Sequence, residues 1–360
     1  MMQYISKKKL LGVVLGLVAI FIHLTMGPNT MESWYAGFYK AVRYCLDYTI
    51  GLLGIPFTYV LALAALWWFY RILLKFWRDS PRKVGSWVAL IVGVLSMLGW
   101  LVFFFYTLWG FNYDRLRFDE RISWSAHPPE EEAFIAECNE QIRRLASQRS
   151  THLKSIDESL LKDAYRLLET VIRQDAIELA AEYGYHISSP VQCRQLIPKG
   201  ILLRFGTAGF YNPLTGECNI DKGLHPLQKP FVMAHEFFHG AGVTGEGDCN
   251  FLAYVLCRNS QLPFIRYSGE LGYWRYLRGS FRRLDKDQYE SSYNRLPKIV
   301  RSDIEAIDTQ MAAYPDIAPR LRDQMYSAYL KSNKIHDGLA NYGRVVELVL
   351  SWRSNKYALP

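Results

Sequence analysis

Three apolar runs dominate the first third of the chain. The runs at about 50–70 and 84–111 contain no charged residue, and each is long enough to cross a bilayer as a helix. A shorter run at about 10–26 follows three consecutive lysines, as in a secretory signal peptide or an uncleaved anchor. We favour the anchor because no small-x-small cleavage site follows the run. Residues 1–112 are therefore predicted to form a membrane domain with three transmembrane helices.

Composition and charge support this division. Half of the residues are hydrophobic (50%) and 21% are charged, which is too apolar for an ordinary soluble enzyme. Residues 1–112 hold ten Lys or Arg against three acids, whereas the remaining 32 basic and 31 acidic side chains nearly balance. The balanced part shows no basic stripe with interleaved aromatics, so we expect no nucleic acid as a partner. The lipid bilayer is the expected partner of the N-terminal part.

The basic residues predict how the chain crosses the membrane. The loop at 71–83 (RILLKFWRDSPRK) is rich in Lys and Arg, and short cationic loops stay in the cytoplasm. The lysines before the first run place the N-terminus on the same side, so the third span carries the C-terminal domain out of the cytoplasm. We thus expect a multi-pass protein of the cytoplasmic membrane with an extracytoplasmic domain. Trp34, Phe38 and Val42 recur at helical spacing and predict a short amphipathic helix on the outer leaflet.

Beyond residue 112 the composition becomes that of a globular protein. Residues 113–128 are polar and turn-rich and are expected to form a juxtamembrane linker before a domain at 129–360. Short strands are predicted at 201–205 (ILLRF) and 217–221 (ECNID). Helical periodicity predicts helices near 130–148, 156–183, 229–241, 246–258, 302–313, 318–332 and 339–353. The expected fold class is α+β, mostly α, with a small sheet placed before the central helices.

The six cysteines form no CxxC pair, which argues against a cysteine-based zinc ribbon. In a domain outside the cell, Cys193 and Cys218 are open to a disulfide bond, which their spacing does not test.

The pattern that carries chemistry is HExxH, formed by His235, Glu236 and His239. Residues four apart on a helix project from one face, so both imidazoles are placed to bind one metal ion, with Glu236 beside them. Apolar residues flank the motif, and Pro230 suits the first turn of a buried helix. The pattern therefore predicts a zinc site.

A zinc site of this kind needs a third protein ligand and leaves the fourth position for water. Glu246 and Asn250 lie four apart, on one face of the next predicted helix. We expect Glu246 to bind the metal and Asn250 to hydrogen-bond the free ring nitrogen of a histidine. Asp248 is the rival third ligand. The alternative for both acids is a solvated first turn, where acids interact favourably with the helix dipole.

Substrate contacts are expected just before the metal helix. The ECNI strand is a candidate edge along which an extended peptide pairs, and Glu217 and Asn219 would then line the cleft. Candidates for a donor to the oxyanion are Tyr211, His225, Tyr254, Arg266 and Tyr273.

Four stretches, at 109–115, 209–220, 234–254 and 329–350, resemble domain of unknown function family 3810. Its members are bacterial membrane-anchored proteins placed among the zincin-like metallopeptidases. In the family pattern HExxH is followed by a Gly, here Gly242, and then by an acid-x-acid-Ala-Asn stretch, in which Cys249 replaces the Ala here. Gly240 stands where the family commonly has Gln.

The resemblance also bears on the third ligand. The ExxxN spacing is similar to the ExxxD of the gluzincins, in which the Glu binds zinc, and this favours Glu246 over Asp248. The resemblance implies a peptidase-type fold with Zn²⁺ as cofactor, without an established substrate.

The expected function is that of a membrane-anchored zinc metallopeptidase that hydrolyses peptide bonds at the outer face of the membrane. Zinc would polarise a water and the scissile carbonyl, while Glu236 takes the proton of the water and delivers it to the leaving amine. Its partner would be a peptide or protein substrate; no pattern indicates an oligomeric state. The alternative is a zincin-derived binding or assembly module that retains zinc and catalyses nothing.

Overall fold

The structure is a computed structural model that describes residues 7–78, 84–153, 165–187, 191–333 and 343–358. The chain divides into two compact units. Unit 1 comprises Met1–Leu116 together with the turn Asn212–Glu217, and unit 2 comprises Arg117–Tyr211 and Cys218–Pro360. Each unit is described by itself.

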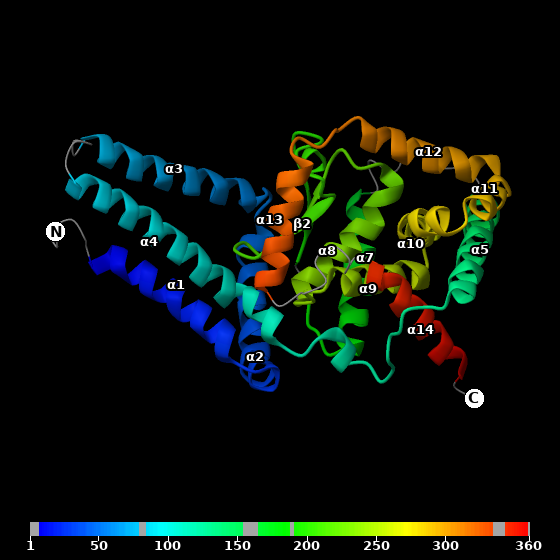
Figure 1. The fold of residues 1–360 in the computed structure, drawn as a ribbon, viewed down its shortest axis with the longest axis horizontal. Coiled ribbons are helices and arrows are strands. Elements are labelled where there is room, and N and C mark those ends of the chain that lie inside the picture. Colours follow the sequence, from blue (N-terminus) through cyan, green and yellow to red (C-terminus); the bar gives the residue numbers. More distant parts are fainter. Residues whose placement is uncertain (1–6, 79–83, 154–164, 188–190, 334–342, 359–360) are drawn as a thin grey trace. The chain divides into compact units, whose positions relative to one another are not determined.

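Unit 1 is built from helices. Their bounds are α1 Lys7–Thr25, α2 Pro28–Asp47, η2 Ile50–Leu52, α3 Phe57–Arg78, α4 Val84–Leu108 and η3 Gly110–Asp114. Figure 1 shows α1, α3 and α4 as the long helices of this unit, and α4 packs against both of the others.

Among the described residues, two helices are long and apolar enough to cross a membrane, α3 and α4. The prediction of three spans is therefore wrong by this measure. The apolar part of α1, Lys9–Thr25, is shorter than the roughly 20 residues that a 30 Å hydrocarbon core requires. The most apolar 18-residue window of α3 is 0% buried inside the protein, and that of α4 is 11% buried. Such large exposed apolar faces are typical of helices whose solvent is lipid.

Glycines set the contact between α1 and α4. A Cβ atom on Gly99 would lie 2.2 Å from the carbonyl oxygen of Gly12, and one on Gly16 would lie 2.7 Å from the Cα of Gly99. Small residues four apart allow two helix backbones to approach closely, as in many helix pairs in lipid. The two helices run in the same direction, since Lys9 donates to the carbonyl oxygen of Ala89 near one end and His23 lies 4.8 Å from Tyr106 near the other.

The predicted amphipathic segment is helix α2, which is longer than expected. One face is buried at every fourth position, namely Met31, Tyr35, Tyr39, Arg43 and Asp47. Beside this stripe the exposed rings of Trp34 and Phe38 stack with their centroids 6.5 Å apart. The buried stripe ends in an ion pair of 2.6 Å between Arg43 and Asp47, and Arg43 also donates to the carbonyl oxygen of Gly216 at 2.8 Å.

Unit 2 is mostly helical with one small sheet, in agreement with the predicted fold class. Its longer elements are α5 Glu131–Ser147, α7 Tyr165–Glu182, α8 Lys229–Ala241, α9 Glu246–Asn259, α10 Pro263–Leu284, α11 Lys286–Asn294, α12 Lys298–Ala312, α13 Pro319–Ser332 and α14 Arg344–Ala358. Short turns of helix are η4 Phe118–Glu120, η5 Gln148–His152, η6 Leu203–Phe205 and η7 Pro226–Gln228. The start of the helix predicted at 156–183 lies outside the described residues. The core is formed where α8, α9 and α10 pack together.

The sheet has three strands, β1 Cys193–Leu196, β2 Gly209–Asn212 and β3 Glu217–Asp221, in the order β1-β3-β2. Strand β1 is parallel to β3, with Cys193 opposite Cys218. No disulfide joins these two cysteines. The Cys218 thiol instead donates to the carbonyl oxygen of Glu236 at 3.2 Å.

The prediction of a strand at 201–205 is wrong, because this segment forms a turn followed by η6. The Asp221 carboxylate accepts hydrogen bonds from the backbone N–H groups of Gly200 and Leu202, both at 2.7 Å. These bonds hold the segment in a turn that local propensity for a strand does not reveal.

We predict that Gly99→Ala weakens the packing of α1 on α4. The new methyl group meets the backbone of Gly12, so one helix must move, at a cost of about 1–3 kcal/mol. The melting temperature of the detergent-solubilised chain should fall. The control is Gly37→Ala on α2, where a Cβ meets nothing within 4 Å. Equal melting temperatures for the two variants would contradict the proposed packing role.

Candidate metal centre

Helix α8 presents the HExxH residues. Pro230 stands in its first turn, and the helix ends at Gly242, whose φ of +96° is the left-handed conformation that favours glycine at a helix end. The side chains of Phe237 and Phe238 are fully buried. The buried side chains fix the rotation of α8, and this rotation sets the direction in which the two histidines point.

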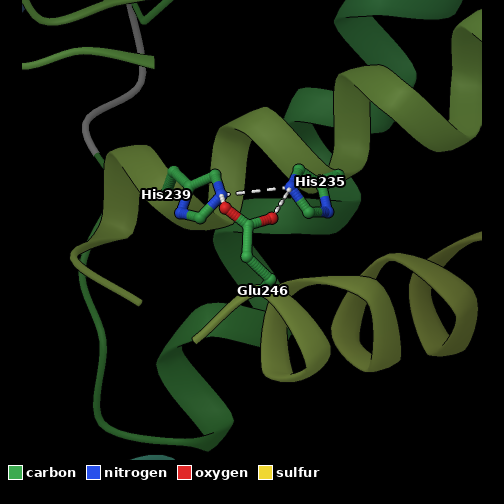
Figure 2. Close-up of side chains that lie close together, drawn as sticks. All are labelled: His235, His239 and Glu246. Atoms are coloured by element: carbon green, nitrogen blue, oxygen red, sulfur yellow. Dashed lines mark hydrogen bonds and ion pairs between the residues drawn. The ribbon is translucent and has the colours of Figure 1, made fainter. Parts of the chain in front are cut away.

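The next helix brings Glu246 to the histidines. The chain reverses at 242–245, and α9 begins at Glu246 and packs on α8. Figure 2 shows the Glu246 carboxylate between the two imidazoles. Its oxygens lie 3.2 Å from Nε2 of His235 and 3.6 Å from Nε2 of His239, and the two Nε2 atoms are 3.0 Å apart. These three residues are a group whose ligand atoms converge closely enough for one metal ion.

The spacing of these atoms fits zinc. Bonds of about 2.0–2.1 Å in a tetrahedral arrangement place neighbouring ligand atoms about 3.3 Å apart. The three measured separations, 3.0, 3.2 and 3.6 Å, bracket this value. Two imidazole nitrogens and one carboxylate oxygen are also ligands that zinc prefers.

The other ring nitrogens fix how the imidazoles present their lone pairs. Nδ1 of His239 lies 2.9 Å from the carbonyl oxygen of Val243, and Nδ1 of His235 lies 2.8 Å from Oδ1 of Asn250. These oxygens accept, so each Nδ1 donates, and in the neutral imidazole Nε2 then carries the lone pair. Tyr276 donates its hydroxyl to the same Oδ1 of Asn250 at 2.9 Å. Asn250 thus stands in the role expected from the sequence.

Electrostatics within the cluster favour a charged Glu246. Burial opposes ionisation of its carboxyl, but His239 and His235 beside it hold its pKa well below the ordinary value. A hydroxyl from outside the motif also contacts it, because Tyr326 on α13 donates to Oε1 at 2.5 Å. The carboxylate is therefore held toward the imidazoles from two sides.

The structure places Asp248, the rival third ligand, away from the cluster. Nε of Arg344 donates to its Oδ1 at 3.0 Å, and Arg344 also lies 3.4 Å from Asp119. Burial raises the pKa of the Asp248 carboxyl in spite of this guanidinium. Of the two acids, only Glu246 belongs to the group of converging ligand atoms.

Glu236 is buried beside the cluster. A Cβ on Gly209 of β2 would lie 2.7 Å from Oε1 of Glu236, so this glycine makes room for the carboxyl. Burial raises the pKa of Glu236 to about 8. Its Oε2 has no hydrogen-bond partner among the described residues.

The two predicted substrate contacts are not supported. Strand β3 lies in the middle of the sheet, so the proposed pairing edge does not exist there. Asn219 is 0% exposed on this central strand. The Glu217 carboxylate accepts from the backbone N–H groups of Phe57 and Thr58, at 2.7 and 2.8 Å, and so caps the N-terminus of α3 within unit 1. Its charge serves helix capping rather than a cleft.

Among the oxyanion candidates, Tyr254 lies in a buried network. Its hydroxyl accepts from Arg353 at 2.5 Å and contacts Glu270, and its ring lies 4.6 Å from that of Tyr273. These contacts explain both tyrosines as parts of the core. Neither tyrosine belongs to the group of converging ligand atoms.

Sequence reasoning missed Tyr326, Tyr276 and Arg344. Tyr326 lies 80 residues from Glu246 in the chain, and no local pattern links the two. Arg344 falls within 329–350, one of the stretches that carry the family resemblance, and this resemblance was the signal that could have pointed to Arg344.

Fold and site together define a mostly helical protein with two apolar helices and a partly buried group of two histidines and one glutamate. The family model described as "Protein of unknown function (DUF3810)" matches residues 34–350, and the chain belongs to this family. Comparisons with curated proteins and with solved structures give no match.

We predict that the purified chain binds one Zn²⁺ and that Glu246→Gln weakens this binding. Loss of a direct ligand should cost more than the roughly 10–100-fold that loss of an outer partner costs. Asp248→Asn is the matched control, because it alters the neighbouring acid but leaves the converging atoms in place. Zinc affinity is measured by competition with a chelator. A larger loss for Asp248→Asn would show that the ligand has been assigned to the wrong acid.

Proposed function

We propose that the protein is a zinc-dependent metallopeptidase anchored in a membrane. The observation that carries the proposal is the convergence of His235, His239 and Glu246 within bonding geometry for one ion, with Glu236 next to His235 in the chain. The family assignment is consistent with this activity and does not establish it.

The residues divide the chemistry among them. When bound by His235, His239 and Glu246, zinc would supply a Lewis acid that polarises the carbonyl of the scissile peptide bond. Glu236, with a carboxylate oxygen that has no partner among the described residues, accepts the proton of the attacking water. The same carboxyl then delivers this proton to the leaving amine, so Glu236 ends the cycle in its starting state.

Hydrogen bonds from outside the motif position the ligands. Asn250 and the carbonyl of Val243 hold the rings of His235 and His239, while Tyr326 holds Glu246. A site whose outer contacts are already made needs little rearrangement when the metal binds. This arrangement favours a preorganised catalytic site over a surface that collects metal adventitiously.

Membrane anchoring is the second part of the proposal. Helix α4 is the most apolar helix of the two spans, with a mean hydropathy of 2.6, and the basic loop before it favours a cytoplasmic start. The parallel packing of α1 on α4 puts Lys9, in the first turn of α1, near the start of α4. We therefore place the C-terminal domain outside the cytoplasm, with α3 and α4 as the membrane-spanning helices.

We predict that Glu236→Gln abolishes peptide cleavage while leaving zinc binding unchanged. The amide keeps the shape of the side chain but cannot take a proton from water, and it is not one of the converging ligands. Cleavage of an unbiased peptide library is compared for the wild type and the variant, with zinc content measured on both. Zinc-loaded wild-type protein that cleaves nothing would shift the assignment to a binding or assembly module.

We also predict the side of the membrane on which the domain lies. In a Cys45→Ala background, a cysteine introduced at the exposed Ser302 should react with an impermeant maleimide in intact cells. A cysteine introduced at Ser80, in the basic loop, should react only after the cells are permeabilised. The reverse pattern would refute the proposed topology.

A further inference from the structure

Unit 2 contains a cavity of about 250 Å³ beside the metal-binding helix. It lies where α8, α10, α12 and η7 meet. Its walls include Phe231, Val232, Leu271, Trp274, Ile304 and Ile307. The walls are thus largely apolar.

The cavity lies on the same face of α8 as the candidate metal centre. Phe231 and Val232 precede His235 by four and three residues, and side chains at these spacings share one face of a helix. The helical rise puts their Cα atoms about 5–6 Å from that of His235 along the axis. The cavity wall therefore lies one turn before His235 on α8, although His235 does not itself line the cavity.

The charged side chains that line the cavity are one ion pair and the exposed Arg275. Arg278 and Asp308 both line it and neutralise each other in a bidentate ion pair, with two N–O distances of 2.8 Å. Arg275 donates to the hydroxyl of Tyr276 at 3.0 Å. Burying a charged side chain against the apolar walls is unfavourable because of the cost of its desolvation.

One wall residue has an unused donor. The indole N–H of Trp274 has no hydrogen-bond partner among the described residues, although this side chain is only 1% exposed. A buried donor is costly to leave unsatisfied, so native proteins usually provide it with a partner. Because Trp274 lines the cavity, a bound group or an ordered water there is a natural source of that partner.

The volume indicates the size of the occupant. A cavity of about 150 Å³ holds a benzene molecule. The cavity beside α8 is larger, at about 250 Å³, and has room for the whole side chain of a phenylalanine, tyrosine or leucine. Burial of such a side chain in an apolar site is favoured by the hydrophobic effect.

We propose that this cavity is a specificity site that binds a large apolar side chain, aromatic or aliphatic, of a peptide substrate. The proposal rests on the proposed peptidase function, since it places this side chain close to the bond that is cleaved. It goes beyond that function by naming the class of residue selected and the helix face that selects it.

Direct binding tests the proposal independently of turnover. Zinc-loaded Glu236→Gln protein in detergent is titrated calorimetrically with N-acetyl-X-amide, where X is Phe, Leu, Ser or Asp. The Phe and Leu compounds should bind at least roughly 10-fold more tightly than the Ser compound, and the Asp compound should bind worst. Equal binding of all four compounds, or no binding of any, would overturn the proposal.

Filling the cavity locates the binding. Ile307→Phe adds volume at the wall and should remove the preference for Phe and Leu without loss of zinc content. Ile299→Phe is the matched control on the same helix α12, because Ile299 is 45% exposed and does not line the cavity. Met311→Phe, at another wall position, replaces Ile307→Phe if that variant fails to fold. A preference that survives both filling variants would place the binding elsewhere and overturn the assignment.

The two proposals fail in different ways. If the wild type cleaves no peptide but Glu236→Gln still binds apolar compounds in a manner that depends on Ile307, the peptidase proposal falls and the cavity remains a ligand site. If the wild type cleaves peptides without preference for an apolar residue, the peptidase proposal stands and the specificity site is overturned.

Discussion

The site depends on one electrostatic constraint: two imidazole nitrogens and one carboxylate face one another closely enough to bind one metal ion. The Nε2 atoms of His235 and His239 are 3.0 Å apart, and in the neutral imidazoles whose Nδ1 donates to an oxygen each Nε2 carries a lone pair. The Glu246 carboxylate adds negative charge to the same space. A bound metal ion converts this mutual repulsion into three attractive bonds. Without a metal, a proton shared within the cluster is the remaining way to reduce the repulsion. Because the pKa of Glu246 is lowered, its carboxyl does not hold that proton.

Helix α9 separates its acids by direction. Glu246 and Asn250 lie one turn apart and face the histidines, whereas Asp248 lies between them in sequence and faces Arg344. Asp248 is buried and Glu246 is partly buried, and each has its own partner: Arg344 for Asp248 and the histidines for Glu246. Separate partners prevent the two acids from competing for one ion. An acid-x-acid pattern at the start of a helix is thus compatible with one ligand and one structural ion pair.

Sequence predicts most where the signal is local. Periodicity and a proline in the first turn placed a helix at 229–241, which agrees with α8, and spacing alone brought Glu246 and Asn250 to one helix face. Prediction from sequence fails where a structural feature is set by a contact between residues far apart in the chain. The order of strands is not encoded in a single strand, so the central position of β3 was missed, and the carboxylate of Glu217 gives no sign that it caps α3. A turn held by Asp221 replaced the strand expected at 201–205. Tyr326 reaches the site from a helix with no recognisable motif.

The same stripe of α8 serves two purposes, and its sequence shows why they are coupled. Phe231 and Val232 form a wall of the cavity, and His235 and His239 continue that face toward Glu246. The opposite face is filled by Phe237 and other buried side chains, which prevent rotation of the helix about its axis. The cavity and the ligand atoms therefore cannot shift independently of each other. In the proposed peptidase, a group bound against Phe231 would have a fixed position along the helix relative to His235. This one helix would then set both selectivity and the placement of the reacting bond.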